Sequence, residues 1–176
     1  MRVRNRSGER VAFAAVVLVF ALGGTQAKSD VLGCRMLPGT YVTTITDIEG
    51  VFASRGIVTF FPSGILITTD SRQGGQTGVY DPFSAGQGAW SCSEGGGGSV
   101  RFSGLSLTFT MPPGSSGSKF GRVDYTGTID PNTAQISGEL SLRLSEAQDL
   151  EGADPLGNQG EVLETFNFVG SRVVAP

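Results

Sequence analysis

The side chains that could move protons in this chain are few, and the clearest candidates are Glu164 and Tyr125. Glu164 stands two residues before Phe166 and four before Phe168, so in a β-strand the three side chains share one face. A carboxylate among aromatic rings has a raised pKa and can act as a general acid or base. The alternative, which we favour, is that Glu164 is solvated at the rim of its strand or pairs with an arginine.

Other chemistry is restricted by composition, because the chain of 176 residues contains no histidine. This removes the usual general base near neutral pH and the commonest transition-metal ligand, and two cysteines alone do not complete a zinc site. The acidic stretch 149–154 lacks the twelve-residue calcium pattern. Glycines 95–98 precede neither Lys-Ser/Thr nor a helix, so they are no phosphate loop. We expect no metal and no cofactor, and we favour a binding protein over an enzyme.

Residues 1–27 have the features of an export signal. Four arginines precede an unbroken apolar run, 11–22, and the small-residue stretch 25–27 follows it. The run is shorter than the roughly 20 residues of a membrane span. We therefore expect cleavage near Ala27 and one mature domain, 28–176, that is secreted or periplasmic and does not insert into the membrane.

The expected mature chain is acidic. Without the four arginines and the single glutamate of 1–27, it carries nine basic and fifteen acidic residues, a net charge of −6. An acidic surface repels phosphate backbones and anionic headgroups. We expect no nucleic-acid partner; the oligomeric state is not readable from these features.

Two cysteines, Cys34 and Cys92, form an even pair in an exported chain, which favours a disulfide. Closing that loop of almost sixty residues contributes about 4 kcal/mol in the chain-entropy model. The stretch 31–34, Val-Leu-Gly-Cys, also looks like the box at which bacterial lipoproteins are cut and lipidated. That alternative requires the cysteine directly after the apolar run, whereas Leu22 lies a dozen positions earlier, so we favour the disulfide.

After Gly39 the chain shows strand signals and almost no helix signals. β-Branched and aromatic segments alternate with Gly, Pro and Asn turns. The cleanest alternation lies in 136–144, where apolar residues and glycine occupy one face and polar residues the other. The predicted strands are 41–46, 56–61, 65–69, 87–92, 100–110, 120–129, 136–144 and 162–174.

Eight consecutive strands without helices predict an all-β, antiparallel up-and-down barrel, because closure removes the exposed edges of the sheet. The second, fourth and sixth connections are tight, whereas the first, third, fifth and seventh are longer. Alternate connections of a meander lie at opposite ends, so we expect four longer loops around a ligand mouth. Cys34, Cys92, Tyr41 and Arg172 should meet at the other end.

At these residues the chain resembles the calycin superfamily, the lipocalins and their bacterial relatives. Their barrels open with Gly-x-Trp and close with a basic residue near the end of the last strand. Here Gly39-Thr40-Tyr41 and Arg172 match those positions, with tyrosine in place of tryptophan. Stretches 59–64 and 86–90 also look like exported bacterial barrels of this type. The resemblance covers roughly 39–174, and it implies barrel-base closure by Arg172 over the Tyr41 ring and the binding of a small ligand.

Strand alternation also assigns the side chains that face the barrel interior. Leu105, Leu107 and Phe109 share one face, as do Val123, Tyr125 and Ile129. These residues either fill a core or line a cavity. The candidate ligand-contacting residues are Phe60, Trp90, Leu107, Phe109, Tyr125, Phe166 and Phe168.

Three functions are compatible with these features. The leading hypothesis is the binding of a small apolar or amphipathic molecule inside the barrel. The second is a cyclase or isomerase similar to the allene oxide cyclase barrels, with Glu164 and Tyr125 handling protons. The third is a filled barrel that acts as an interaction or inhibitor module through its rim loops.

Overall fold

The computed structural model describes residues 32–77, 81–95, 99–110, 119–146 and 162–175. The expected export signal, 1–27, and the acidic stretch 149–154 lie outside these residues. Within them the fold is a short 3-10 helix followed by eight strands that form one closed barrel. No helix in the described part is long and apolar enough to cross a membrane.

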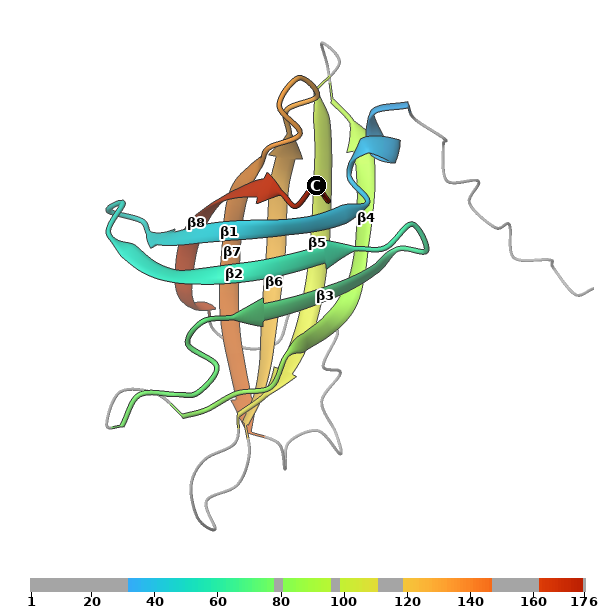
Figure 1. Cartoon of the computed structure of the whole chain (residues 1–176). Coiled ribbons are helices and arrows are strands. Elements are labelled where there is room, and N and C mark those ends of the chain that lie inside the picture. Colours follow the sequence, from blue (N-terminus) through green and yellow to red (C-terminus); the bar gives the residue numbers. More distant parts are fainter. Residues whose placement is uncertain (1–31, 78–80, 96–98, 111–118, 147–161, 176) are drawn as a thin grey trace, which may run out of the picture.

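The strands pair in sequence order, each antiparallel to the next, and β8 pairs with β1 to close the sheet. This confirms the predicted up-and-down barrel. Figure 1 shows β1, β2 and β3 lying across the front and β5, β6 and β7 running steeply behind them. The elements are η1 (Leu32–Met36), β1 (Gly39–Asp47), β2 (Phe52–Phe60), β3 (Ile65–Asp70), β4 (Gly86–Glu94), β5 (Val100–Phe109), β6 (Lys119–Ile129), β7 (Ile136–Glu146) and β8 (Val162–Arg172).

The two ends of the barrel differ. One end, which we call the base, carries η1, the short connections after β2, β4 and β6, and the end of β8. At the opposite end, which we call the loop end, β3, β5 and β7 finish and β4, β6 and β8 begin. Of the connections between them, 71–85 is described except for 78–80, whereas 111–118 and 147–161 lie outside the described residues. The prediction of four longer loops there is wrong for the first one. Residues 48–51 form a tight hairpin, because Asp47 accepts hydrogen bonds from the backbone N–H groups of Glu49 and Val51.

The base is filled by aromatic side chains. The Phe60 ring meets Tyr41, Trp90 and Phe102 edge to face, with centroids 5.8, 5.7 and 5.2 Å apart. Such pairs add about 0.5–1.5 kcal/mol each beyond the area they bury. Phe102 fits because Gly127 faces it; a Cβ there would lie 2.6 Å from the Phe102 ring.

The segment before β1 seals this base. Leu37 is fully buried, and the Tyr41 hydroxyl donates a hydrogen bond to its carbonyl at 3.0 Å. Arg172 donates to the carbonyls of Met36, at 3.0 Å, and of Pro38, while its guanidinium lies 5.9 Å from the centre of the Tyr41 ring. The structure thus brings Tyr41 and Arg172 together at the end where the meander places them.

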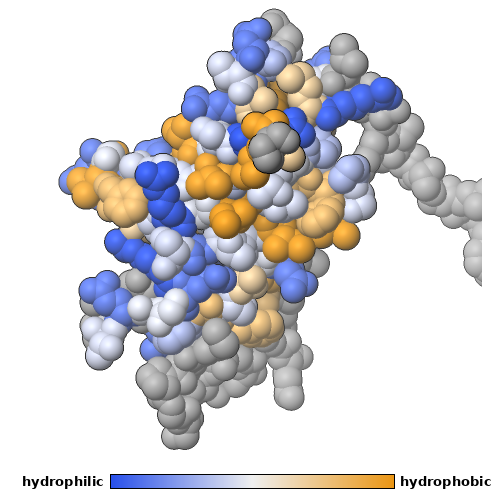
Figure 2. Space-filling view, in the orientation of Figure 1, coloured by the Kyte–Doolittle hydropathy of each residue, from blue (hydrophilic) through white to orange (hydrophobic). Residues whose placement is uncertain are grey.

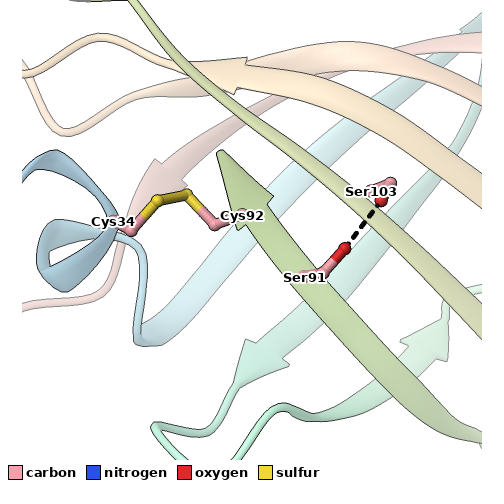
Figure 3. The surroundings of a disulfide bond; sticks show 4 residues. All are labelled: Cys34, Ser91, Cys92 and Ser103. Carbon is pink, nitrogen blue, oxygen red and sulfur yellow. Dashed lines mark hydrogen bonds between the residues drawn. A yellow bond between two sulfur atoms is a disulfide. The ribbon is translucent and has the colours of Figure 1, made fainter. Parts of the chain in front are cut away.

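The predicted disulfide is present. It joins Cys34 of η1 to Cys92 near the end of β4, with Cα atoms 5.8 Å apart, and Figure 3 shows it linking the two elements. Both cysteines pack against the core of the base. A disulfide is typical of proteins that fold in an oxidising compartment.

Candidate ligand-binding site in the barrel interior

Halfway toward the loop end the barrel interior changes from aromatic to polar. Small and hydroxyl-bearing side chains replace the rings of the base, and three of them are buried although polar. Ser106 is only 1% exposed, which is unusual for a serine outside a hydrogen-bonded cluster. We call the following residues the polar cluster: Thr43 of β1, Ser54 of β2, Thr68 and Asp70 of β3, Ser106 of β5 and Tyr125 of β6.

Barrel register brings these six residues together from distant parts of the chain. Thr68 pairs with Gly86 of β4. Gly88, two residues further along the same face of β4, pairs with Ser106. Ser106 in turn pairs with Val123, two residues before Tyr125 on the same face. The Thr68 hydroxyl lies 3.5 Å from that of Ser106. The polar cluster therefore depends on β4 as the wall between β3 and β5.

Glycine makes room for these hydroxyls. A Cβ on Gly86 would lie 2.4 Å from the Thr68 hydroxyl oxygen, and one on Gly56 would lie 2.6 Å from that of Thr43. Real Cβ atoms do not come so close, so alanine at either position would displace a polar side chain. The glycines of β2 and β4 are thus part of the polar cluster's construction.

Tyr125 is the central group of the polar cluster. Burial raises the pKa of Tyr125, hydrogen bonds with the side chains of Ser106 and Thr68 partly offset that rise, and the charge of Asp70 adds to it. The phenol therefore keeps its proton throughout the neutral range. It can donate one hydrogen bond and accept another, as required for recognising a hydroxyl, carbonyl or amine group.

Asp70 supplies the carboxylate. The Ser54 hydroxyl donates to one of its oxygens at 2.7 Å, and the backbone N–H of Arg72 donates to the other at 2.7 Å. These bonds hold the carboxylate at the end of β3, where the chain leaves the barrel wall for the loop 71–85. A carboxylate fixed in this way is a hydrogen-bond acceptor for a donor on a ligand.

Apolar groups adjoin the polar cluster. The Tyr125 ring lies 6.3 Å from that of Phe168, and Phe166, Val123 and Ile45 are partly buried on the same inward faces. The interior thus offers hydrogen-bonding groups beside a hydrophobic wall. That combination suits an amphipathic molecule.

The structure separates the predicted ligand-contacting residues into three groups. Phe60 and Trp90 face inward but are packed within the base, where the Trp90 indole N–H donates to the carbonyl of Phe61. Tyr125, Phe166 and Phe168 face the interior near the polar cluster. Leu107 and Phe109, both on β5, point outward.

The expectation that Leu105, Leu107 and Phe109 face the interior is wrong. Phe109 is 47% exposed, and its ring packs on that of Phe120 with centroids 5.3 Å apart. Phe102 pairs with Gly127 and Ser106 with Val123, and both partners face inward. The inward positions of β5 are therefore Phe102, Gly104, Ser106 and Thr108. Leu107 and Phe109 are therefore removed from the candidate ligand contacts.

Glu164 has the solvated location that we favoured for it. It is exposed near the start of β8 and pairs with Leu142 of β7. The carboxylate whose charge acts on Tyr125 is Asp70, which sequence reasoning missed. Strand alternation could have identified Asp70. In the stretch 66–70 it places Thr68 and Asp70 on the same face as the buried Leu66.

A concave surface lies on the outside of β4–β7. This hollow of about 650 Å³ is open to solvent, and Ser/Thr side chains, together with Arg101 and Glu139, provide most of its polar groups. Two of its serines, Ser91 and Ser103, hydrogen-bond to each other at 3.0 Å, as Figure 3 shows. Because these hydroxyls remain accessible to water, the hollow requires no ligand to satisfy them.

The described residues contain no group of three or more His, Cys, Asp or Glu side chains arranged to hold a metal ion. Comparison with known proteins identifies no relative: no family model, no curated protein and no solved structure is significantly similar to this chain.

Proposed function

We propose that this protein is an exported, calycin-like barrel that binds a small amphipathic molecule in the loop-end half of its interior. The observation that carries the proposal is the polar cluster inside the barrel. Burying hydroxyls and a carboxylate costs free energy that their hydrogen bonds only partly recover, so an apolar core would stabilise a purely structural barrel at less cost. A binding role explains why hydroxyls and a carboxylate occupy interior positions.

The proposal also follows from how the interior is divided. The aromatic cluster around Phe60 leaves the base to protein side chains, so a ligand enters from the loop end. Its polar group would exchange hydrogen bonds with Tyr125 and Asp70, and its apolar part would lie along Phe166 and Val123. Export agrees with the arginine-rich, apolar segment 1–27 and with the disulfide, and a secreted or periplasmic location follows.

The experiment is a fluorescence titration with 1-aminoanthracene, an aromatic amine with one polar group. We expect saturable binding to the purified, oxidised protein, with energy transfer from Trp90, the single tryptophan of the chain. Tyr125→Phe should weaken binding about three- to tenfold, the cost of one lost hydrogen bond. The matched control is Thr126→Val, since Thr126 is the next residue along β6 and is exposed on the outer face.

Native mass spectrometry of the protein after incubation with cell extracts identifies the natural ligand. The proposal is rejected if the probe does not saturate and no extract leaves a bound molecule. In that case the third function, a filled barrel acting through its rim loops, takes its place. Equal affinities of Tyr125→Phe and Thr126→Val would show that binding occurs elsewhere.

A cyclase or isomerase is the second candidate, favoured by one observation. Asp70 and Tyr125 are both inward-facing members of the polar cluster, and the charge of Asp70 contributes to the raised pKa of Tyr125. Such a pair can remove a proton at one atom of a ligand and return it at another. Isomerisation changes chromatographic retention without changing mass. A molecule recovered in the extract experiment with unchanged mass but a shifted retention time would therefore support this candidate.

A further inference from the structure

The outer surface of β1–β3 differs from that of β5–β7. Its outward side chains are Val, Ile, Thr and Ala, with Arg55 the single charged one among the described strand positions. The outer surface of β5–β7, by contrast, carries charges of both signs. The β1–β3 outer face consists of Thr40, Val42, Thr44, Thr46, Ala53, Arg55, Ile57, Thr59, Ile65, Ile67 and Thr69.

Large apolar side chains on this face are exposed. Ile57 is 48% exposed, Ile65 49% and Val42 42%, and Val42 pairs directly with Ile57 across β1 and β2. Phe61, in the turn between β2 and β3, adds a ring that is 40% exposed. Figure 2 shows this as a hydrophobic area on the front of the molecule, with hydrophilic residues gathered lower on the same face.

The area continues past the end of β8. The backbone N–H of Val173 donates to the carbonyl of Thr40 at 2.8 Å, so the chain after β8 stays beside β1. Val173 is 52% exposed. Val42, Ile57, Phe61, Ile65 and Val173 together expose on the order of 400 Å² of surface, well above a scatter of single apolar residues and close to the largest patch of a typical monomer.

The polar groups of this face are also suited to burial. The hydroxyls of Thr40 and Thr59, neighbours across β1 and β2, lie 3.0 Å apart and hydrogen-bond to each other. Covering them would therefore remove little hydrogen bonding to water. β-Branched side chains on a pleated surface are typical of faces along which two sheets pack.

We propose that the β1–β3 outer face joins two copies of this chain as a symmetric dimer. At a two-fold axis every residue near the axis meets its own copy, so a charged face would oppose like charges. The β1–β3 outer face carries one charged side chain among its described positions, Arg55, which lies toward the loop end, so the centre of the face avoids this repulsion. The chain also has a net charge of −3, so two copies repel each other less along a face without acidic residues than along an acidic one.

The composition of the face agrees with a dimer interface. A stable interface covers about 800 Å² on each partner, with an apolar centre and a polar rim. The exposed valines, isoleucines and Phe61 supply the apolar centre, with the Thr40–Thr59 pair lying among them. Thr44, Thr46 and Arg55, toward the loop end, supply a polar rim. The proposal is independent of the ligand site, because these side chains point away from the barrel interior.

Sedimentation velocity of the purified, disulfide-bonded protein over a wide concentration range tests the proposal. We expect a species of twice the protomer mass that dissociates on dilution. Ile57→Lys should weaken dimerisation about thirtyfold or more, since it places two like charges in the centre of the interface. The matched control, Thr128→Lys on the outer surface of β6, should leave the dimer intact. Ile65→Lys tests the same face if Ile57→Lys fails to fold, with far-ultraviolet circular dichroism as the check.

A second measurement locates the contact. Ile57→Cys should form a disulfide-linked dimer on oxidation, visible on a non-reducing gel, whereas Thr128→Cys should remain monomeric there. A wild-type protein that is monomeric at all concentrations overturns the proposal and leaves the face to a different partner. A dimer that Ile57→Lys and Ile65→Lys do not weaken overturns it as well.

Discussion

Replacing both Cys34 and Cys92 with alanine should cost this protein about 4 kcal/mol of unfolding free energy. The disulfide joins residues that are 58 positions apart. In the chain-entropy model, closing a loop of that length removes about 14 cal/mol/K of entropy from the unfolded chain, which is about 4 kcal/mol at 25 °C. For a chain of this size, each 1 kcal/mol corresponds to about 2–4 °C in Tm, so the melting temperature should fall by about 8–16 °C.

The barrel should still fold without the disulfide. Even without the disulfide, η1 and the segment after it remain attached to the base through the bonds from Tyr41 to the Leu37 carbonyl and from Arg172 to that of Met36. The strand ladders do not include the disulfide. We therefore expect the far-ultraviolet spectrum of the double variant to match that of the wild type, with the destabilisation arising mainly in the unfolded state.

The assay is urea unfolding followed by circular dichroism and by the fluorescence of Trp90, which reports on the base. Reduction of the wild-type protein should reproduce the shift of the double variant. Ser103→Ala, an exposed position on the neighbouring strand, is the control and should change the free energy of unfolding by no more than about 0.5 kcal/mol. A double variant as stable as Ser103→Ala would refute the argument from loop entropy.

The remaining predictions concern the interior phenol and the base. Burial raises the pKa of Tyr125 above its ordinary value of 10.0, so the folded protein keeps a proton that the unfolded chain releases, and stability should fall as the pH rises above about 10. In Tyr125→Phe the free energy of unfolding, measured by urea titrations at pH 9 and above, should fall less over that range. A fall identical to that of the wild type would contradict the attribution of this pH dependence to Tyr125. Arg172→Met should lower the free energy of unfolding by about 2–3 kcal/mol, because it removes charged donors from the carbonyls of Met36 and Pro38. A thermal melt unchanged from wild type would show that these bonds do not stabilise the base.

Much of the fold is readable from local pattern. Strand segments are marked by β-branched and aromatic residues, and their ends by Pro62-Ser63-Gly64, glycines 95–98 and Asp130-Pro131-Asn132. All eight predicted strands are present, most with ends within a few residues of the prediction, although β2 begins at Phe52 rather than Gly56. The disulfide also follows, because the meander brings the start of the first strand and the end of the fourth to the same end of the barrel.

The orientation of β5 shows where local pattern is insufficient. Leu105, Leu107 and Phe109 are more apolar than Gly104, Ser106 and Thr108, yet the second set faces inward. An alternating pattern fixes which residues share a face but not which face is covered. Contacts with neighbouring strands determine which face of β5 points inward, because Phe102 packs against Gly127 and joins the aromatic rings at the base.

The composition of the candidate site also depended on contacts between neighbouring strands. The sequence by itself determined the strand order, the barrel class, the cysteine pair and the set of residues that share a face with Tyr125. Only the pairing of β3 with β4, β4 with β5 and β5 with β6 brought Thr68, Ser106 and Tyr125 into one hydrogen-bonded group, with Asp70 near enough for its charge to act on Tyr125. The physical reason is that these residues are separated by up to 57 positions, and their contacts depend on the register of three successive strand pairings, which no single segment specifies.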